Sequence, residues 1–144
     1  MALMGQMMAS PLLISSLLKH AARHAGDTEI VSKRVEGDVH RYGWRDAELR
    51  SRKLAQAFAR LGLQAGDRVA TLAWNGYRHL EIYYGSSGSQ LVCHTINPRL
   101  FPEQIAWIAN DAQDLALCFD LTFLPLVEKL MPSLPTVKHF IAMT

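Results

Sequence analysis

One stretch of the chain, residues 91–119, restricts the possible folds more than any other. A short apolar run over Leu91–Ile96 precedes the turn Asn97–Arg99, and a second apolar run covers Leu115–Phe119. Between the two runs, a segment opened by Pro102 repeats apolar residues at spacings of three, four and seven from Ile105. That spacing is typical of an amphipathic helix, whereas the flanking runs are typical of buried strands. The stretch therefore predicts one βαβ unit.

The same alternation continues on both sides of this unit. After Gly66, four apolar runs alternate with three helical patterns. We expect strands over 68–74, 91–96, 115–119 and 137–141, and helices over 77–87, from 102 and over 123–130, with Asp120 as a side-chain cap. Alternating strands and helices favour a parallel sheet with right-handed crossovers.

The first part of the chain predicts additional elements outside that sheet. A helical pattern runs from Pro11 to Gly26, two short strands joined at Glu36–Asp38 lie within 29–44, and a further helix begins near Asp46. The second helix is expected to end at Gly62 and to bury an apolar stripe of Leu54, Ala57, Phe58 and Leu61. The predicted fold class is α/β: an incomplete Rossmann-like parallel sheet flanked by helices, with an N-terminal helix and a β-hairpin. Residues 1–11 are expected to be a flexible N-terminus.

Composition narrows the classes of partner. Fifteen basic and thirteen acidic residues give a net charge of +2. This balance, without a basic cluster interleaved with aromatic residues, gives no basis for a nucleic-acid partner. The first eighteen residues carry no charged side chain, but Gly, Ser and Pro interrupt them. We therefore expect no signal peptide and no membrane span, and a cytoplasmic location is the default.

Sulfur and imidazole groups do not indicate a metal site. Cys93 and Cys118 lie in strand-like runs and are expected to be buried thiols, with a disulfide as the minority alternative. Two cysteines cannot complete a four-thiolate zinc site. His20 and His24 have helical spacing that could chelate a metal, but no third ligand lies nearby in sequence, so we interpret them as surface residues.

Polar residues at the carboxyl ends of the expected strands form the candidate ligand wall. They are Trp74 and Asn75, Asn97 and Arg99, and Asp120. Ligands of open α/β sheets bind at that edge, although ordinary loop and capping chemistry is the alternative interpretation.

No catalytic residue and no metal ligand is predicted. Cys93 and His94 are neighbours on one strand and should point to opposite faces. The single carboxylates Glu81 and Glu103 are expected to be solvated or to cap helices. The Gly/Ser-rich stretch 85–89 ends a helix and precedes a strand, which is the reverse of a phosphate-binding loop.

Three blocks of the sequence resemble a known family. The blocks are Arg68–Asn75, Cys93–Ile105 with its Cys-His-Thr-Ile-Asn-Pro-Arg-Leu motif, and Phe119–Val127. They resemble the N-terminal part of the adenylate-forming enzymes, and within them the fatty-acyl-CoA synthetases. Residues 42–49 and 91–103 are similar to the first two core motifs of that family. The resemblance implies that residues 12–144 are the N-terminal part of an AMP-binding large domain, truncated before the phosphate loop.

The resemblance also implies an activity for the complete enzyme. Members activate a fatty acid with ATP and Mg²⁺ and then transfer the acyl group to coenzyme A. The family's phosphate loop, adenine-binding aromatic motif, ribose-binding Asp and adenylating Lys are all missing from these 144 residues. We therefore expect this chain to be inactive alone and to bind none of these cofactors by itself. Its partners would be a second copy or the remainder of the enzyme.

One alternative belongs to a different class of function. An α/β module without catalytic activity could pair with another chain through its open sheet edge. One local departure from the family also needs an explanation. Residues 85–90 are Gly-Ser-Ser-Gly-Ser-Gln where members show small apolar residues. Hydroxyls at a buried helix–sheet contact require hydrogen-bond partners, or the packing is loosened.

Overall fold

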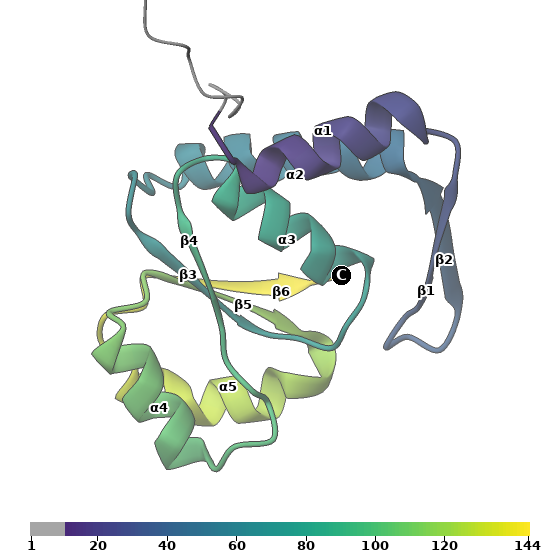
Figure 1. Ribbon diagram of the computed structural model, residues 1–144. Coiled ribbons are helices and arrows are strands. Elements are labelled where there is room, and N and C mark those ends of the chain that lie inside the picture. Colours follow the sequence, from purple (N-terminus) through teal and green to yellow (C-terminus); the bar gives the residue numbers. More distant parts are fainter. Residues whose placement is uncertain (1–10) are drawn as a thin grey trace, which may run out of the picture.

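The computed structural model describes residues 11–144. The expected flexibility of residues 1–11 falls almost wholly on residues 1–10, which lie outside the described residues. Figure 1 shows a central sheet with helices on both faces and a separate two-stranded hairpin at one side. The sheet consists of β3 (Arg68–Leu72), β4 (Val92–Thr95), β5 (Ala116–Asp120) and β6 (His139–Met143). All pairings are parallel and the strand order is β4-β3-β5-β6, which confirms the predicted parallel sheet.

Helices alternate with these strands as the sequence predicts. They are α3 (Tyr77–Ser87), α4 (Pro102–Asp111) and α5 (Leu124–Leu130), with 3₁₀ turns η1 (Leu121–Phe123) and η2 (Met131–Ser133) flanking α5. The N-terminal part contributes α1 (Ile14–His24), the antiparallel strands β1 (Glu29–Lys33) and β2 (Val39–Gly43), and α2 (Trp44–Arg60). Within residues 11–144, no helix combines the length and apolarity needed to cross a bilayer.

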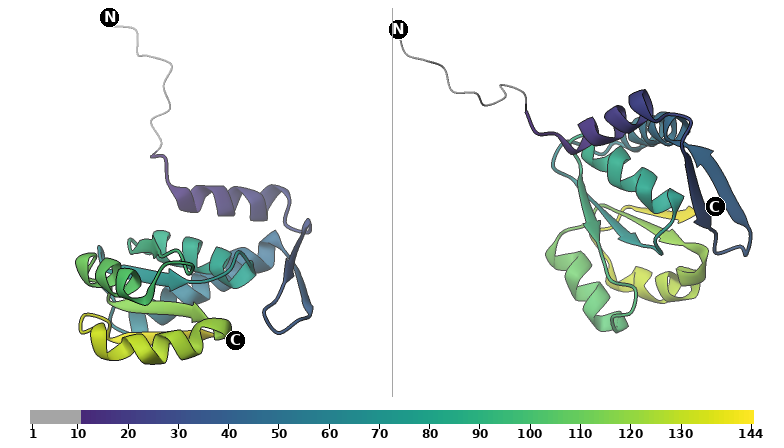
Figure 2. Two further views of the ribbon diagram at one scale, coloured as in Figure 1. Left: turned by 90° about the horizontal axis from the view of Figure 1, so that it is seen from below. Right: turned by 45° about the vertical axis from the view of Figure 1, so that its right-hand side comes forward.

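Two apolar cores cover the two faces of the sheet. Successive side chains of β3 and β5 point to opposite faces of the sheet. Nearly all of them are buried, because helices cover both faces. Ala70, Leu72, Leu117 and Phe119 face α4 and α5. The opposite core holds Val69, Ala116 and Cys118 of the strands with Phe58 of α2 and Ile82 of α3. α1 packs on α2 and α3, so it forms an outer layer on this side (Figure 2).

The predicted buried stripe of α2 is partly wrong. Phe58 is buried and Leu54 is half-buried, but Ala57 is exposed and Leu61 lies beyond the helix with 41% of its surface exposed. The packed stripe runs instead through Ala47 and Ser51, because α2 rests directly on α3. Gly85 of α3 makes this close approach possible: a Cβ there would lie 3.1 Å from Leu54 Cδ2. Gly62, with φ of +85°, ends the helical segment as expected.

The polar stretch at the end of α3, residues 85–90, leaves no buried hydroxyl without a partner. Ser86 is fully buried, and its Oγ donates to the Ile82 carbonyl at 2.6 Å. Ser89 Oγ donates to the Gly85 carbonyl, also at 2.6 Å. Serine hydroxyls commonly bond to the carbonyl four residues earlier in a helix. These two serines therefore satisfy their hydroxyls within their own helix end and do not need partners from the sheet.

The last strand begins two residues later than predicted. The sequence pattern favours 137–141, whereas β6 covers His139–Met143. Val137 is apolar and buried, but its backbone N–H donates to the Leu134 carbonyl in a turn. Strand pairing starts with Ala116 opposite His139. Pairing with β5, and not apolarity, therefore fixes where this strand begins.

Candidate functional site

The carboxyl edge of the sheet brings together three of the five predicted site residues. β3 and β5 are neighbours, so Trp74, Asn75 and Asp120 line one small pocket. Asp120 Oδ2 accepts the Trp74 backbone N–H at 2.7 Å, and Trp74 Nε1 donates to Thr122 Oγ1 at 3.0 Å. The prediction that Asp120 caps the following helix is wrong: its side chain makes no cap hydrogen bond. The carboxylate ties the ends of two strands together instead.

The hairpin and the start of α3 complete this edge pocket. Its remaining lining residues are Lys33, Arg34 and Val35 of the hairpin and Gly76, Tyr77, Arg78 and His79 of α3. The volume is about 20 Å³. A single water needs about 10–15 Å³, so the edge pocket has room for solvent and not for a nucleotide.

Histidine and arginine side chains of the edge pocket are already engaged. His79 Nε2 lies 3.0 Å from Thr71 Oγ1, and burial lowers the pKa of His79. The guanidinium of Arg34 forms an ion pair with Asp38. Arg78 is buried and donates to both oxygens of Glu36, at 3.2 and 2.7 Å. Neither arginine is therefore left to attract an anion.

Asn97 and Arg99 do not join this group. They follow β4, which lies on the far side of β3 from β5. Asn97 Oδ1 accepts the Arg99 backbone N–H at 3.0 Å, which is an Asx-type turn, and both side chains are exposed. This turn fits the interpretation as ordinary loop chemistry, and a role of these two residues in a ligand wall stays a prediction.

A polar cluster beside the edge pocket was missed by the sequence reasoning. We define the hairpin cluster as Glu36, His40, Tyr42, Arg50, Tyr77, Arg78 and Glu81. It joins the hairpin, α2 and α3. The prediction that Glu81 is solvated or capping is wrong: it is buried and accepts from Arg50 Nε at 2.6 Å. His40 stacks on Tyr77 with ring centroids 3.8 Å apart.

Burial and charge change the acidities in the hairpin cluster. The Arg78 guanidinium lowers the pKa of Glu36. Burial raises the pKa of the Tyr42 hydroxyl, and the nearby Glu81 carboxylate raises it further. Burial also lowers the pKa of His40, and the neighbouring Arg50 adds to this effect. The partners come from positions 31 to 42 apart in sequence, so no local spacing could have revealed them.

A second buried pair lies on the opposite side of the sheet. His94 Nδ1 is 2.9 and 2.8 Å from the two carboxylate oxygens of Asp114, which is fully buried. Burial raises the pKa of Asp114, whereas His94 acts to lower it. Asp114 precedes the amino end of β5, away from the edge pocket. The pair fastens edge strand β4 to the loop before β5, and Cys93 packs on the other face as predicted.

Thiols and metal ligands offer no further site among residues 11–144. Cys93 and Cys118 are both free, and burial raises the pKa of Cys118 to about 12. Within these residues, no group of three or more His, Cys, Asp or Glu side chains could hold a metal ion. Both cysteines are thiols as expected, but only Cys118 is buried, whereas Cys93 is half-buried.

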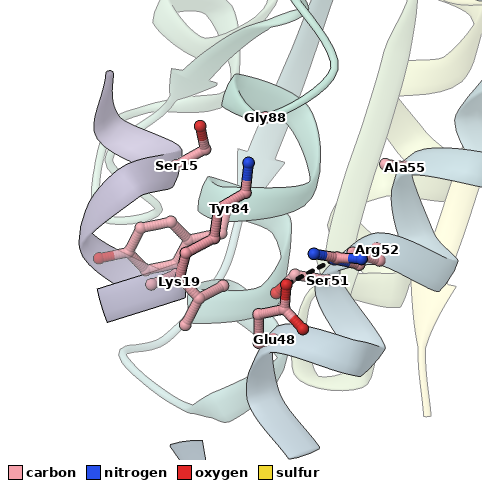
Figure 3. Close-up of a pocket in the computed structure, with 9 residues that line it drawn as sticks. Ser15, Lys19, Glu48, Ser51, Arg52, Ala55, Tyr84 and Gly88 are labelled. Carbon is pink, nitrogen blue, oxygen red and sulfur yellow. Dashed lines mark ion pairs between the residues drawn. The ribbon is translucent and has the colours of Figure 1, made fainter. Parts of the chain in front are cut away.

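A pocket larger than the edge pocket, which shares none of its lining residues, lies between α1, α2 and α3 (Figure 3). Its volume is about 80 Å³. The walls include Ser15 and Lys19 of α1, the Glu48–Arg52 ion pair of α2 and Tyr84 of α3. Oppositely charged groups pair along its wall, and none of its lining residues belongs to the predicted ligand wall.

Comparisons with known proteins assign this fold and sequence to one group. The model of the AMP-binding enzyme family matches residues 17–143. The chain is 57% identical over 141 residues to a 3-methylmercaptopropionyl-CoA ligase of Ruegeria lacuscaerulensis. It is 52% identical, also over 141 residues, to a medium-chain-fatty-acid–CoA ligase of Ectopseudomonas oleovorans. Both matches cover 98% of this chain and 26% of the relative, so the chain spans about a quarter of their length.

Solved structures share the fold. The anthranilate CoA ligase AuaEII, crystallised in complex with anthranoyl-AMP, superposes with a TM-score of 0.80. That match is 19% identical in sequence and covers 93% of this chain and 26% of the other. The N-terminal domain of FACL13 from Mycobacterium tuberculosis superposes with a TM-score of 0.79 at 21% identity, over 91% of this chain and 33% of the other.

Proposed function

The chain belongs to the AMP-binding enzyme family, and we propose that it forms the N-terminal part of an ATP-dependent fatty acid–CoA ligase. The supporting observation is the identity of 57% and 52% to two acid–CoA ligases over nearly the whole chain. In this proposal, residues 12–144 begin the large domain, and the complete enzyme joins a fatty acid to coenzyme A through an acyl-adenylate formed from ATP and Mg²⁺. The cytoplasmic location expected from the sequence stays a prediction.

The role proposed for this segment is structural. Nucleotide and cofactor sites usually have volumes of about 300–1,000 Å³, far above the 20 Å³ of the edge pocket. The Arg34 and Arg78 side chains in its wall are paired with carboxylates. The edge pocket by itself therefore does not fit ATP, and we propose that the nucleotide contacts come from parts of the ligase outside these 144 residues. That Trp74, Asn75 and Asp120 line a ligand wall in the complete ligase stays a prediction.

We propose further that the choice of acid is set outside this segment. Two relatives whose names give different acids, 3-methylmercaptopropionate and a medium-chain fatty acid, match the same stretch at similar identity. A segment shared so evenly is better suited to building the sheet than to selecting the substrate.

A chimaera tests this function. In it, the chain replaces the matching quarter of the Ectopseudomonas oleovorans ligase. We expect acid-dependent ATP–pyrophosphate exchange within about tenfold of the parent, or about 1.4 kcal/mol of activation free energy, and the parent's acid preference. As a matched control, the same chimaera carries Leu117→Asp, which places a charge in the buried centre of the sheet and should abolish exchange by unfolding. A folded chimaera without exchange would contradict the proposal.

The alternative is a module that pairs through an open sheet edge. β4 and β6 are the two outer strands of the sheet, and β6 keeps a half-buried pattern along most of its length. Unpaired strand edges are templates for pairing with another chain. Light scattering coupled to size exclusion distinguishes the two functions. A defined dimer that melts cooperatively favours the module, and aggregation favours a segment that requires the rest of the ligase.

A further inference from the structure

Asp120 differs from the other buried charged side chains of the molecule. Among residues 11–144, four such side chains are buried: Arg78, Glu81, Asp114 and Asp120. Each of the first three has a partner at 2.6–2.8 Å, which is a side chain of opposite charge or, for Asp114, an imidazole. Asp120 is 5% exposed, and it forms no ion pair with any residue that the structure describes. A buried charge without a partner is costly, so this carboxylate needs an explanation.

Only one oxygen of the Asp120 carboxylate is engaged. Oδ2 accepts the Trp74 backbone N–H at 2.7 Å. Oδ1 accepts no hydrogen bond from residues 11–144, but it is not one of the fully enclosed atoms that lack a partner. Because Asp120 lines the edge pocket, this oxygen stays open to a donor that enters the pocket. An ionised carboxylate can accept several hydrogen bonds.

The cationic side chains of the edge pocket are engaged with other groups. Lys33 Nζ donates to a backbone carbonyl of its own hairpin. Arg34 and Arg78 form ion pairs with carboxylates of the hairpin. Burial lowers the pKa of His79, although nearby Asp120 acts to raise it, so the imidazole is neutral at pH 7. None of these four side chains therefore pairs with Asp120.

Asp120 also lies where the chain leaves the sheet. In the pairing of β5 with β6, Asp120 is opposite Met143, the last residue before Thr144. The two ligases that match this chain have about three quarters of their length outside the matched stretch. In the proposed ligase, the polypeptide that follows residue 144 therefore begins beside Asp120.

We propose that a lysine from the part of the ligase outside these 144 residues enters the edge pocket and pairs with Asp120. This inference rests on the proposed function. The edge pocket has a volume of about 20 Å³, which is room for one water-sized group. A lysine ammonium is a compact charge of that kind, whereas the guanidinium of arginine is a wider, planar fork. The ion pair joins the ends of β3 and β5 to the rest of the enzyme.

A divalent metal ion fits the edge pocket less well than an ammonium. Mg²⁺ and Ca²⁺ take about six or more oxygen ligands, and Asp120 is the only carboxylate that lines this pocket. Among residues 11–144, no group of three or more His, Cys, Asp or Glu side chains could hold a metal. One charged, water-sized donor meets the need of Asp120 without further ligands.

Amide hydrogen exchange at the ends of β3 and β5 tests the proposal in two contexts, the chimaera described above and the isolated chain. Asp120→Asn keeps an oxygen for the Trp74 N–H but removes the charge. In the chimaera, we expect exchange to become at least about tenfold faster, because the lysine loses its partner. In the isolated chain, we expect at most about threefold, because only the bond to the Trp74 N–H weakens.

Asp114→Asn is the matched control. Asp114 is also a buried carboxylate, but its partner His94 belongs to the same 144 residues. Exchange around this pair should therefore accelerate by the same factor in the chimaera and in the isolated chain. A difference between the two contexts that is confined to Asp120 assigns its partner to the rest of the ligase.

A double-mutant cycle identifies the lysine. Each lysine in the remaining part of the chimaera is changed to methionine, alone and together with Asp120→Asn. One of these changes should reproduce the faster exchange and add nothing to the effect of Asp120→Asn.

Three results would overturn the proposal. They are an equal effect of Asp120→Asn in both contexts, the absence of any lysine that couples to it, and an isolated-chain dimer that Asp120→Asn abolishes, which would assign the lysine to a second copy. A folded chimaera without ATP–pyrophosphate exchange contradicts the proposed function instead. An active chimaera in which Asp120 is uncoupled contradicts only the ion pair.

Discussion

The two faces of the sheet are held by different chemistry. On the α4–α5 face, apolar residues dominate, and Ile105 and Val127 are almost completely buried. On the α2–α3 face, an apolar centre around Phe58 and Ile82 gives way to the hairpin cluster of ion pairs and stacked rings. Apolar packing is not directional, whereas ion pairs and hydrogen bonds require particular partners. The first face therefore shapes the sheet, and the second sets where the hairpin sits.

Both faces leave buried polar atoms without a partner, and the hairpin cluster leaves more of them. Among residues 11–144, the unpartnered atoms of the hairpin cluster are His40 Nε2, Tyr42 Oη and Arg78 Nε, whereas those of the α4–α5 side are Asn110 Oδ1 and Thr136 Oγ1. Each such atom costs about 1–3 kcal/mol. We therefore expect the hairpin cluster to open before the α4–α5 core does.

The largest effect is expected in the apolar core of the α4–α5 face. Ile105, on the side of α4 that faces the sheet, is completely buried. Ile105→Ala should lower the free energy of unfolding by about 2–5 kcal/mol because it removes buried methylenes and leaves a cavity. Urea denaturation followed by circular dichroism measures this loss. Ile82→Ala, at the apolar centre of the other face, should cost a similar amount; a loss below half of the Ile105 value would mean that the two faces differ throughout.

Removing the buried carboxylate of the hairpin cluster should have a smaller effect. Glu81→Gln weakens the bond to Arg50, and hydrogen bonds to charged groups are worth about 1.5–3 kcal/mol. Arg50 is 48% exposed and can hydrate, so the lower end of that range is expected. Glu103→Gln is the matched control, since Glu103 is exposed in the first turn of α4. Its cost should stay within about 0.5 kcal/mol. If urea denaturation showed equal losses of unfolding free energy for Glu81→Gln and Glu103→Gln, the proposed difference between the two faces would be contradicted.

A conservative change at the ion pair to the hairpin should act locally. Arg78→Lys keeps the charge but loses the two-pronged contact with Glu36. We expect amide hydrogen exchange in β1 and β2 to become about fivefold faster, which corresponds to about 1 kcal/mol of local opening energy. Exchange in β3 and β5 should be unchanged. Uniform acceleration over the whole sheet would show that the hairpin does not open separately.

Acid should loosen the hairpin before it loosens the sheet. Arg78 lowers the pKa of Glu36 below its ordinary 4.5. In the pH range between the lowered pKa and 4.5, the folded hairpin therefore binds fewer protons than the unfolded chain. The stabilising contribution is therefore complete above pH 4.5 and is lost as pH falls through the lowered value. Hydrogen exchange compared at successively lower pH should show protection disappearing first in β1 and β2. Simultaneous loss in β5 would contradict this order.

How much of the molecule could be predicted depended on whether the interaction was local. Periodicity located α3, α4, α5 and the parallel strands, because Ile105 and Val127 contact the sheet from regular helical positions. It failed for Glu81, whose partner Arg50 lies 31 residues away. It also failed for Asp120, because the nearest donor was the Trp74 backbone N–H of a neighbouring strand and not its own helix.

The candidate site shows the same limit. Trp74, Asn75 and Asp120 meet because β3 and β5 are adjacent, whereas Asn97 and Arg99 end on the far side of β3. The sequence indicates which residues follow the carboxyl end of each strand, but it does not give the order of the strands in the sheet. The strand order determined which of the predicted residues lie together. The volume of the edge pocket and the pairing of Arg34 and Arg78 were likewise invisible before the hairpin was placed.

The central claim is that this segment builds part of a ligase fold but contains no complete site for its chemistry. Fatty-acid-dependent ATP–pyrophosphate exchange by the purified 144-residue chain, in the presence of Mg²⁺, tests this claim most directly. We predict no exchange above the background without protein, with the circular dichroism of an α/β fold confirming that the chain is folded. Exchange that depends on the fatty acid and is abolished by Asp120→Asn would contradict the claim and would place catalysis at the edge pocket.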